Sequence, residues 1–310
     1  MGIFPRYDKE GPGVYADDPK QGPITRFFRT YTNKFFKLIS TNLMFVLFNI
    51  PAMFVAYIGV IYFLPLINPV FEPTAFQNYL SDLGITAADA SSTTGGAALQ
   101  LYFLIVLFLV MFAVGMQLVS VGPVQTGLSY VYRNFARESA TFVWSDFAMS
   151  FKNNWKQSLI ATGISIVVTG VIMGNIAFYS STYIGQYNRI FSTIFVMALV
   201  FYMCIQIFVY PLIASLDLKL KNIYRNAILF FIARFLPTIG IFLVDVVVLL
   251  VIPVVLLFSF TYAGFALAIV YYTFFAFSFV HYLNTFFVWQ QIERYIIKPN
   301  ETDSESPKAS

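Results

Sequence analysis

Six long apolar runs constrain this chain of 310 residues more than any other feature. They cover approximately residues 42–66, 98–121, 158–180, 190–214, 237–260 and 264–289. A helix needs about 20 apolar residues to cross the roughly 30 Å hydrocarbon core of a bilayer, and each run is long enough. Because lipid offers backbone groups no hydrogen bonds, such runs form helices there. We therefore expect an all-α integral membrane protein with six transmembrane helices and cytoplasmic interfacial amphipathic helices.

The composition excludes several classes of function. Only 11% of the residues are charged, against about 25% in soluble domains. Cys204 is the single cysteine and His281 the single histidine, which excludes a disulfide framework and a Cys/His metal cluster. The sequence contains no phosphate-binding loop, no nucleophile elbow and no zinc-protease motif. We therefore expect no enzyme, and no catalytic, cofactor-binding or metal-binding residue.

The placement of Lys and Arg indicates the orientation. All but one of the 19 fall in segments on one side of the six runs, and Arg189 is the exception. Because Lys and Arg are enriched in cytoplasmic segments, both termini are expected in the cytoplasm. We expect a disordered cytoplasmic tail over 1–23 and an interfacial amphipathic helix over 24–41. The six-span domain would then cover 42–290, followed by a cytoplasmic tail over 291–310.

The stretch from Gly122 to Leu159 lies between the second and third runs and is amphipathic. One apolar stripe is formed by Val124, Leu128, Val131, Tyr132 and Phe135, and a second by Trp144, Phe147, Phe151 and Trp155. This spacing predicts two short helices that lie in the membrane interface. Such helices can dock a partner, or they can rest on lipid with no partner, and both interpretations remain open at this point.

Polar residues inside the runs form the candidate site. A charge at the centre of a span costs roughly 2.5–3.5 kcal/mol on insertion scales, so Asp245 marks a functional hypothesis. Spans five and six are joined by a very short turn, which permits an Asp245–His281 pair. Similar depths predict one polar layer of Asn49, Gln117, Gln206, Asp245 and His281. It could form a cavity or relay, or only interhelical hydrogen bonds of about 0.6 kcal/mol each.

Several linked motifs resemble a known family. They are G-P-x-x-T-G-L-x-Y-V at 122–131, W-S-D-F-x-x-x-F-K-x-N-x-K-Q-S at 144–158, Y-P-L at 210–212, K-x-x-x-R-N-A at 221–227 and L-P-T at 236–238. Together they resemble the YesL-like family of bacterial membrane proteins, also described as DUF624, over roughly residues 24–290. The matching positions, whose roles are unknown, are Gly122, Pro123, Asp146, Lys152, Asn154, Pro211, Asn226 and Pro237.

The resemblance implies a context rather than an activity. Members of the family tend to be encoded beside carbohydrate ABC importers, and the opening GIFPRYDKEGPGV resembles members from Gram-positive bacteria. The resemblance implies a multi-pass plasma-membrane protein that is an accessory or regulatory component of carbohydrate uptake. Its expected partners are the lipid bilayer and sugar ABC-importer permease subunits, with no nucleic acid. The alternatives are an autonomous small-solute transporter that uses the polar layer around Asp245, and a structural membrane protein with no ligand.

Overall fold

The computed structural model describes residues 22–84, 94–181, 186–258 and 262–297, and within them every regular element is helical. The expected tail over 1–23 and the tail over 291–310 lie mostly outside these residues. The α-helices are α1 Pro23–Asn33, α2 Phe35–Phe48, α3 Ile50–Ile67, α4 Pro73–Asp82, α5 Thr94–Gly115, α6 Gly122–Ala136, α7 Val143–Ser181, α8 Gln186–Ser215, α9 Leu220–Ala233, α10 Phe235–Val246, α11 Ile252–Phe258, α12 Tyr262–Tyr271 and α13 Phe277–Ile292. The short helices are η1 Pro69–Phe71, η2 Val247–Val251, η3 Tyr272–Ala276 and η4 Glu293–Ile297.

Six of the described helical segments are long and apolar enough to span a membrane, which confirms the expected fold class. They are Ile50–Ile67, Ala98–Gly115, Val143–Ser180, Tyr187–Ser215, Phe235–Leu257 and Ala263–Ile297. The third has 38 residues, or about 57 Å at 1.5 Å per residue, nearly twice the thickness of the hydrocarbon core. Because its first half carries Asp146, Lys152 and Lys156, we expect that half to extend out of the bilayer.

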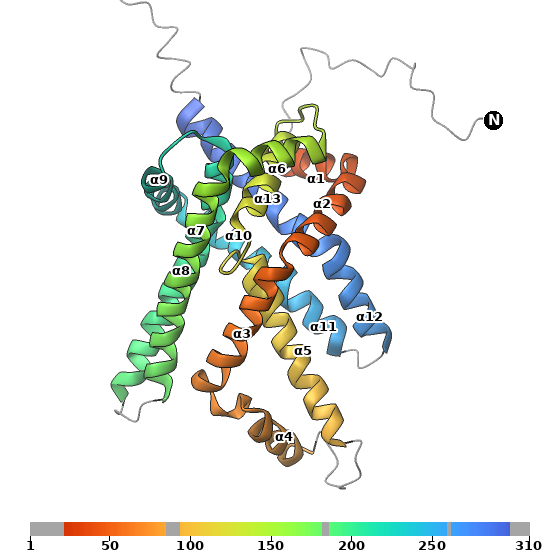
Figure 1. Cartoon of the computed structure of the whole chain (residues 1–310), viewed down its shortest axis with the longest axis vertical. Helices are drawn as coiled ribbons and strands as arrows, with labels where there is room; N and C mark the ends of the chain where they lie inside the picture. Colours follow the sequence, from red (N-terminus) through yellow and green to blue (C-terminus); the bar gives the residue numbers. More distant parts are fainter. Residues whose placement is uncertain (1–21, 85–93, 182–185, 259–261, 298–310) are drawn as a thin grey trace, which may run out of the picture.

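The helices outside the spans gather mainly at one end of the bundle. Figure 1 shows α1, α6 and the end of α13 at this end, together with α9, whereas α4 lies at the opposite end. We call the end that holds α1, α6 and α9 the basic end, because its helices and connections carry every described Lys and Arg except Arg189. The first and last described helices both lie there (Figure 1), as an even number of crossings requires.

The first span is shorter than its apolar run. The expected helix over 24–41 and span over 42–66 are divided into α1, α2 and α3, with interruptions at Lys34 and Asn49. Pro51 is the second residue of α3 and has no N–H to donate, which favours a helix start there. As a result α2 is a separate apolar helix, and it packs against η3 and α13.

The stretch Gly122–Leu159 is not a pair of interfacial helices, which corrects that expectation. In α6 every residue except Tyr130 and Arg133 is buried, because the helix lies between α7, α8 and α13. The side chains of Gln125, Thr126 and Asn134 bond other side chains inside the protein. The second stripe belongs to the first half of α7, which continues unbroken into the third span.

Candidate functional site

Four of the five predicted polar residues, all except Asp245, gather at the connection between α5 and α6, residues 116–121. This loop begins with a Schellman motif, in which the N–H groups of Gln117 and Leu118 bond the carbonyls of Val114 and Ala113 at 3.1 and 3.0 Å. Gln117 occupies the left-handed position of the motif, with φ 61°, where glycine is usual. That backbone directs its side chain toward α13, where Gln117 Nε2 lies 2.8 Å from His281 Nδ1.

Side chains from other helices satisfy the rest of the loop. The Asn49 Oδ1, at the break between α2 and α3, accepts from the Val121 N–H at 2.9 Å. The Thr162 hydroxyl donates to the Ser120 carbonyl and accepts from the Gly122 N–H. The Ser165 hydroxyl donates to the Leu118 carbonyl at 2.9 Å. Irregular backbone is stable beside a membrane only when it is satisfied in this way.

Gln206 joins the same network from α8. Its Nε2 donates to the Ser165 hydroxyl at 3.0 Å and also to the Tyr202 hydroxyl. Three of the predicted polar residues, Asn49, Gln117 and Gln206, therefore meet around one loop, and His281 is bonded to it. Sequence reasoning did not identify Thr162 and Ser165, because a single hydroxyl in a long apolar helix gives no signal of its partner.

Asp245 is bonded apart from this loop. Its Oδ2 accepts from Asn284 Nδ2 at 3.0 Å, and its Oδ1 has no hydrogen-bond partner. His281 is bonded to Gln117 and its Nε2 also has no partner. The pair Asp245–His281 therefore does not form. Asp245 and His281 lie in the fifth and sixth spans, but His281 belongs to the loop network and Asn284 provides the contact of Asp245.

Two π-helices lie side by side in spans five and six. The hydroxyls of Tyr271 and Tyr272 donate to the carbonyls of Val248 and Leu249 in η2. Asn42 of α2 bonds the other π-helix, η3. Its Nδ2 donates to the carbonyls of Tyr272 and Thr273 at 2.8 and 2.7 Å. The Asn42 Oδ1 accepts from the Ser278 N–H at 2.7 Å. Asn42 therefore saturates the backbone groups that the π-helix frees, and π-helices often occur at functional sites.

Residues of the two family motifs at 122–131 and 144–158 hold α6 and α7 together. A Cβ on Gly122 would lie 2.1 Å from the Ser158 carbonyl oxygen, and one on Gly127 would lie 2.7 Å from the Phe147 ring. The hydroxyls of Thr126 in α6 and Ser158 in α7 are 2.6 Å apart. These two glycines therefore allow close contact of the two helices.

The remaining resemblance positions have varied surroundings. Pro123 is in the first turn of α6 and Asp146 Oδ2 accepts from the Phe142 N–H at the start of α7. Asn154 Nδ2 bonds the Ser150 carbonyl one turn earlier. Pro211 lies inside α8 next to Tyr210, whose hydroxyl is 3.2 Å from that of Thr162. Asn226 is half-buried in α9, and Lys152 and Pro237 are exposed.

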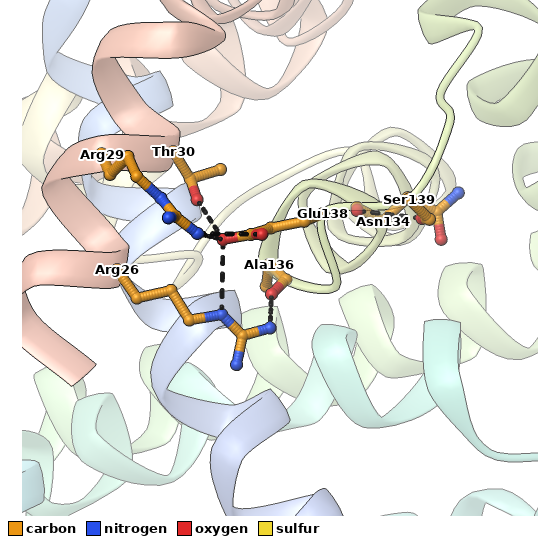
Figure 2. Close-up of polar contacts among 7 residues, drawn as sticks. All are labelled: Arg26, Arg29, Thr30, Asn134, Ala136, Glu138 and Ser139. Carbon is orange, nitrogen blue, oxygen red and sulfur yellow. Dashed lines mark hydrogen bonds and ion pairs between the residues drawn. The ribbon is translucent and has the colours of Figure 1, made fainter. Parts of the chain in front are cut away.

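A charged clamp at the basic end joins α1 to the end of α6 (Figure 2). Glu138 follows α6 with φ 55°, again the left-handed position of a Schellman motif, closed by the Ser139 N–H to the Asn134 carbonyl. Arg29 Nη2 donates to both Glu138 oxygens at 2.8 and 3.1 Å. Arg26 donates to the Ala136 carbonyl at 2.7 Å. The hydrogen bond from Arg29 lowers the pKa of Glu138 below its ordinary value.

The polar layer is closed to solvent. Asp245 and Asn49 are 0% exposed, and Gln117, Gln206 and His281 are buried almost as completely. An apolar crevice between α5 and α12 is lined by other residues, namely Leu107, Phe108, Met111, Phe265, Ala268, Ile269, Tyr272 and Thr273. Among the described residues, no three His, Cys, Asp or Glu side chains converge as metal ligands would. The layer thus connects helices through buried hydrogen bonds, and a few of its polar atoms, such as Asp245 Oδ1 and His281 Nε2, have no hydrogen-bond partner.

Comparison with known proteins gives one match. No curated protein and no solved structure matches the chain. The family model described as "Protein of unknown function, DUF624" matches residues 101–176, from within α5 through α6 to near the end of α7. The matched segment thus contains the 116–121 loop, the glycine contacts of α6 and most of α7, and in this segment the chain is similar to the DUF624 family.

Proposed function

We propose that this protein is a non-enzymatic accessory or regulatory component of ABC-type carbohydrate uptake. In this proposal it resides in the plasma membrane of a Gram-positive bacterium, with the basic end and both termini in the cytoplasm. The resemblance to YesL-like proteins supplies the carbohydrate context. The observation that carries the proposal is an exposed aromatic and basic face on the part of α7 that extends beyond the bilayer.

That face is built for contact. Trp144 is 62% exposed and Trp155 is 47% exposed, and Lys152 and Lys156 are exposed beside them. Lys152 follows Trp144 by two steps of four residues and precedes Trp155 by three, which places the three side chains along one side of the helix. The Lys156 ammonium lies 5.6 Å from the centre of the Trp155 ring. Tryptophan is enriched among the residues that dominate binding energy at protein interfaces.

The closed polar layer favours an accessory role over transport. A translocation path needs polar groups that water or solute can reach, whereas Asp245, Gln117 and His281 are covered by packed helices. Their hydrogen bonds instead hold the 116–121 loop against α13, and α10 against α13, in a fixed arrangement. Such a rigid scaffold suits a protein whose function is to present one face to a partner.

Co-purification with a coexpressed sugar-importer permease tests this proposal. The variant K152A/W155A removes the centre of the α7 face, and recovery of the permease should fall at least about tenfold, since a dominant interface residue contributes about 2 kcal/mol or more. The matched control is F54A/Y62A, which removes two aromatic side chains that are each 65% exposed on span α3. Equal recovery with both variants would contradict the proposal.

The second candidate function is an autonomous small-solute transporter, and the unpaired Asp245 Oδ1 and His281 Nε2 favour it. In that case the purified protein alone would move solute across liposomes. The D245N variant would abolish this movement, whereas N175A, at a half-buried α7 position, would not. Such a result would reject the accessory role.

A further inference from the structure

Two arginines flank one aromatic ring at the basic end. The guanidinium carbon of Arg234 lies 5.5 Å from the centre of the Tyr295 ring, and that of Arg294 lies 5.6 Å from it. Arg234 sits between α9 and α10, whereas Arg294 and Tyr295 belong to η4. The Phe230 ring of α9, 6.1 Å away, holds Tyr295 in place. Residues that are distant in the sequence thus form one cationic and aromatic cluster.

No carboxylate in the described part of the chain forms an ion pair with the cluster. Among the described residues, the ion pairs within 4.0 Å involve only Glu138 with Arg26 and Arg29. Glu293, the nearest carboxylate in sequence, pairs with neither arginine of the cluster. In addition, the Arg234 Nε is buried and has no hydrogen-bond partner. A buried donor without a partner is costly, and guanidinium groups match the oxygens of phosphate in geometry and charge. The missing partner is therefore expected to be an oxyanion.

The position of the cluster indicates the source of that oxyanion. Arg234 immediately precedes span five, and Arg294 lies near the end of span six. The sequence neighbours of Arg234 are apolar and exposed, with Ile232 at 65% and Leu236 at 78%. Apolar side chains that are exposed beside a span face acyl chains, whereas arginine at the end of a span lies at headgroup depth. Both halves of a phospholipid therefore have a complementary surface here.

We propose that Arg234, Arg294 and Tyr295 bind the phosphodiester headgroup of an anionic phospholipid. The two guanidinium groups pair with the phosphate oxygens, and Tyr295 holds the guanidinium groups beside its ring. The acyl chains lie along the exposed apolar residues next to Arg234. This site is independent of the α7 face and of any importer.

Native mass spectrometry of the purified full-length protein, titrated with phosphatidylglycerol, tests the site. Each of R234Q and R294Q should weaken binding about five-fold, because a basic residue near an anionic membrane surface contributes about 1 kcal/mol. The matched control is R225Q, which removes an exposed charge from α9 at the same end. Its effect should be less than about two-fold. Y295F keeps the ring and should bind like the wild type, whereas Y295L should bind more weakly.

Two further arms identify the ligand. Phosphatidylcholine has no net negative charge and should bind more weakly than phosphatidylglycerol to the wild type. Inorganic phosphate at millimolar concentration should not displace the bound lipid, and displacement would assign the site to free phosphate instead. Equal losses for R234Q, R294Q and R225Q would overturn the proposal. Because R234Q could impair folding through its position between two helices, R294Q on the exposed η4 provides an independent result.

Discussion

At the scale of single residues, two residues stand out because they adopt a backbone conformation that glycine prefers. Gln117 and Glu138 have φ values of 61° and 55°, and the left-handed region costs an ordinary residue roughly 1–2 kcal/mol. Each occupies the same place in a Schellman motif, and each makes a polar contact with a distant helix. Glycine could close either turn but could not make these contacts, which explains why larger residues are present.

The Glu138 clamp should make stability depend on pH. The folded pKa of Glu138 is lowered, so its contribution is complete above the ordinary carboxyl range and is lost as pH falls through the lowered value. Because the side chain is 39% exposed, solvent screening limits the contribution to less than about 1 kcal/mol. The wild type should therefore melt about 2 °C or less above E138Q at neutral pH.

Thermal unfolding in detergent from neutral to acidic pH checks this prediction. The difference between wild type and E138Q should shrink toward zero under acidic conditions, since both then carry an uncharged side chain at position 138. A constant difference across the whole range would show that the carboxylate charge is not what stabilises the clamp.

At the scale of elements, the two π-helices are the features that hydropathy could not indicate. Residues 247–251 and 272–276 are as apolar as the α-helices around them. Their geometry is set by side chains elsewhere, because Asn42, Tyr271 and Tyr272 bond the backbone groups that a π-helix frees. Asn42 lies 230 residues before Tyr272, so no local pattern connects them.

Replacing Asn42 should therefore destabilise the bundle. N42L keeps the approximate volume but loses three hydrogen bonds to buried backbone, and we expect a loss of about 2–4 kcal/mol in unfolding free energy. N42D should cost at least as much, because a carboxylate would face two carbonyl oxygens. Reversible unfolding in mixed micelles measures both. N175A removes an exposed bond to the Val171 carbonyl within one turn and should change stability little. A near-neutral N42L would contradict this account of η3.

At the scale of the whole molecule, α6 is the core around which the basic end assembles. Its buried position explains the small residues along it. G122A should cost about 3 kcal/mol or more, because the new methyl group would meet the Ser158 backbone, which cannot move easily. G127A should cost less, about 1–3 kcal/mol, because a ring can shift more easily than backbone.

The matched control lies on α7. At Gly170 a Cβ meets nothing within 4 Å, so G170A should be neutral or stabilising by up to about 1 kcal/mol through helix propensity. Melting temperatures of the three purified variants test the order. If G122A were no worse than G170A, α6 and α7 would not be in the close contact described.

The sequence by itself determined the class of the protein and the number of spans. Run length, hydropathy and spacing are local properties, and a bilayer acts on them directly. Only the tertiary structure decided that α6 is buried rather than interfacial. An apolar stripe suits lipid and a protein core equally well, and the difference lies in whether the polar faces find partners. The tertiary structure also decided which residue each buried polar side chain bonds. His281 bonds Gln117 rather than Asp245, across 164 residues, and no local pattern encodes a contact at that distance.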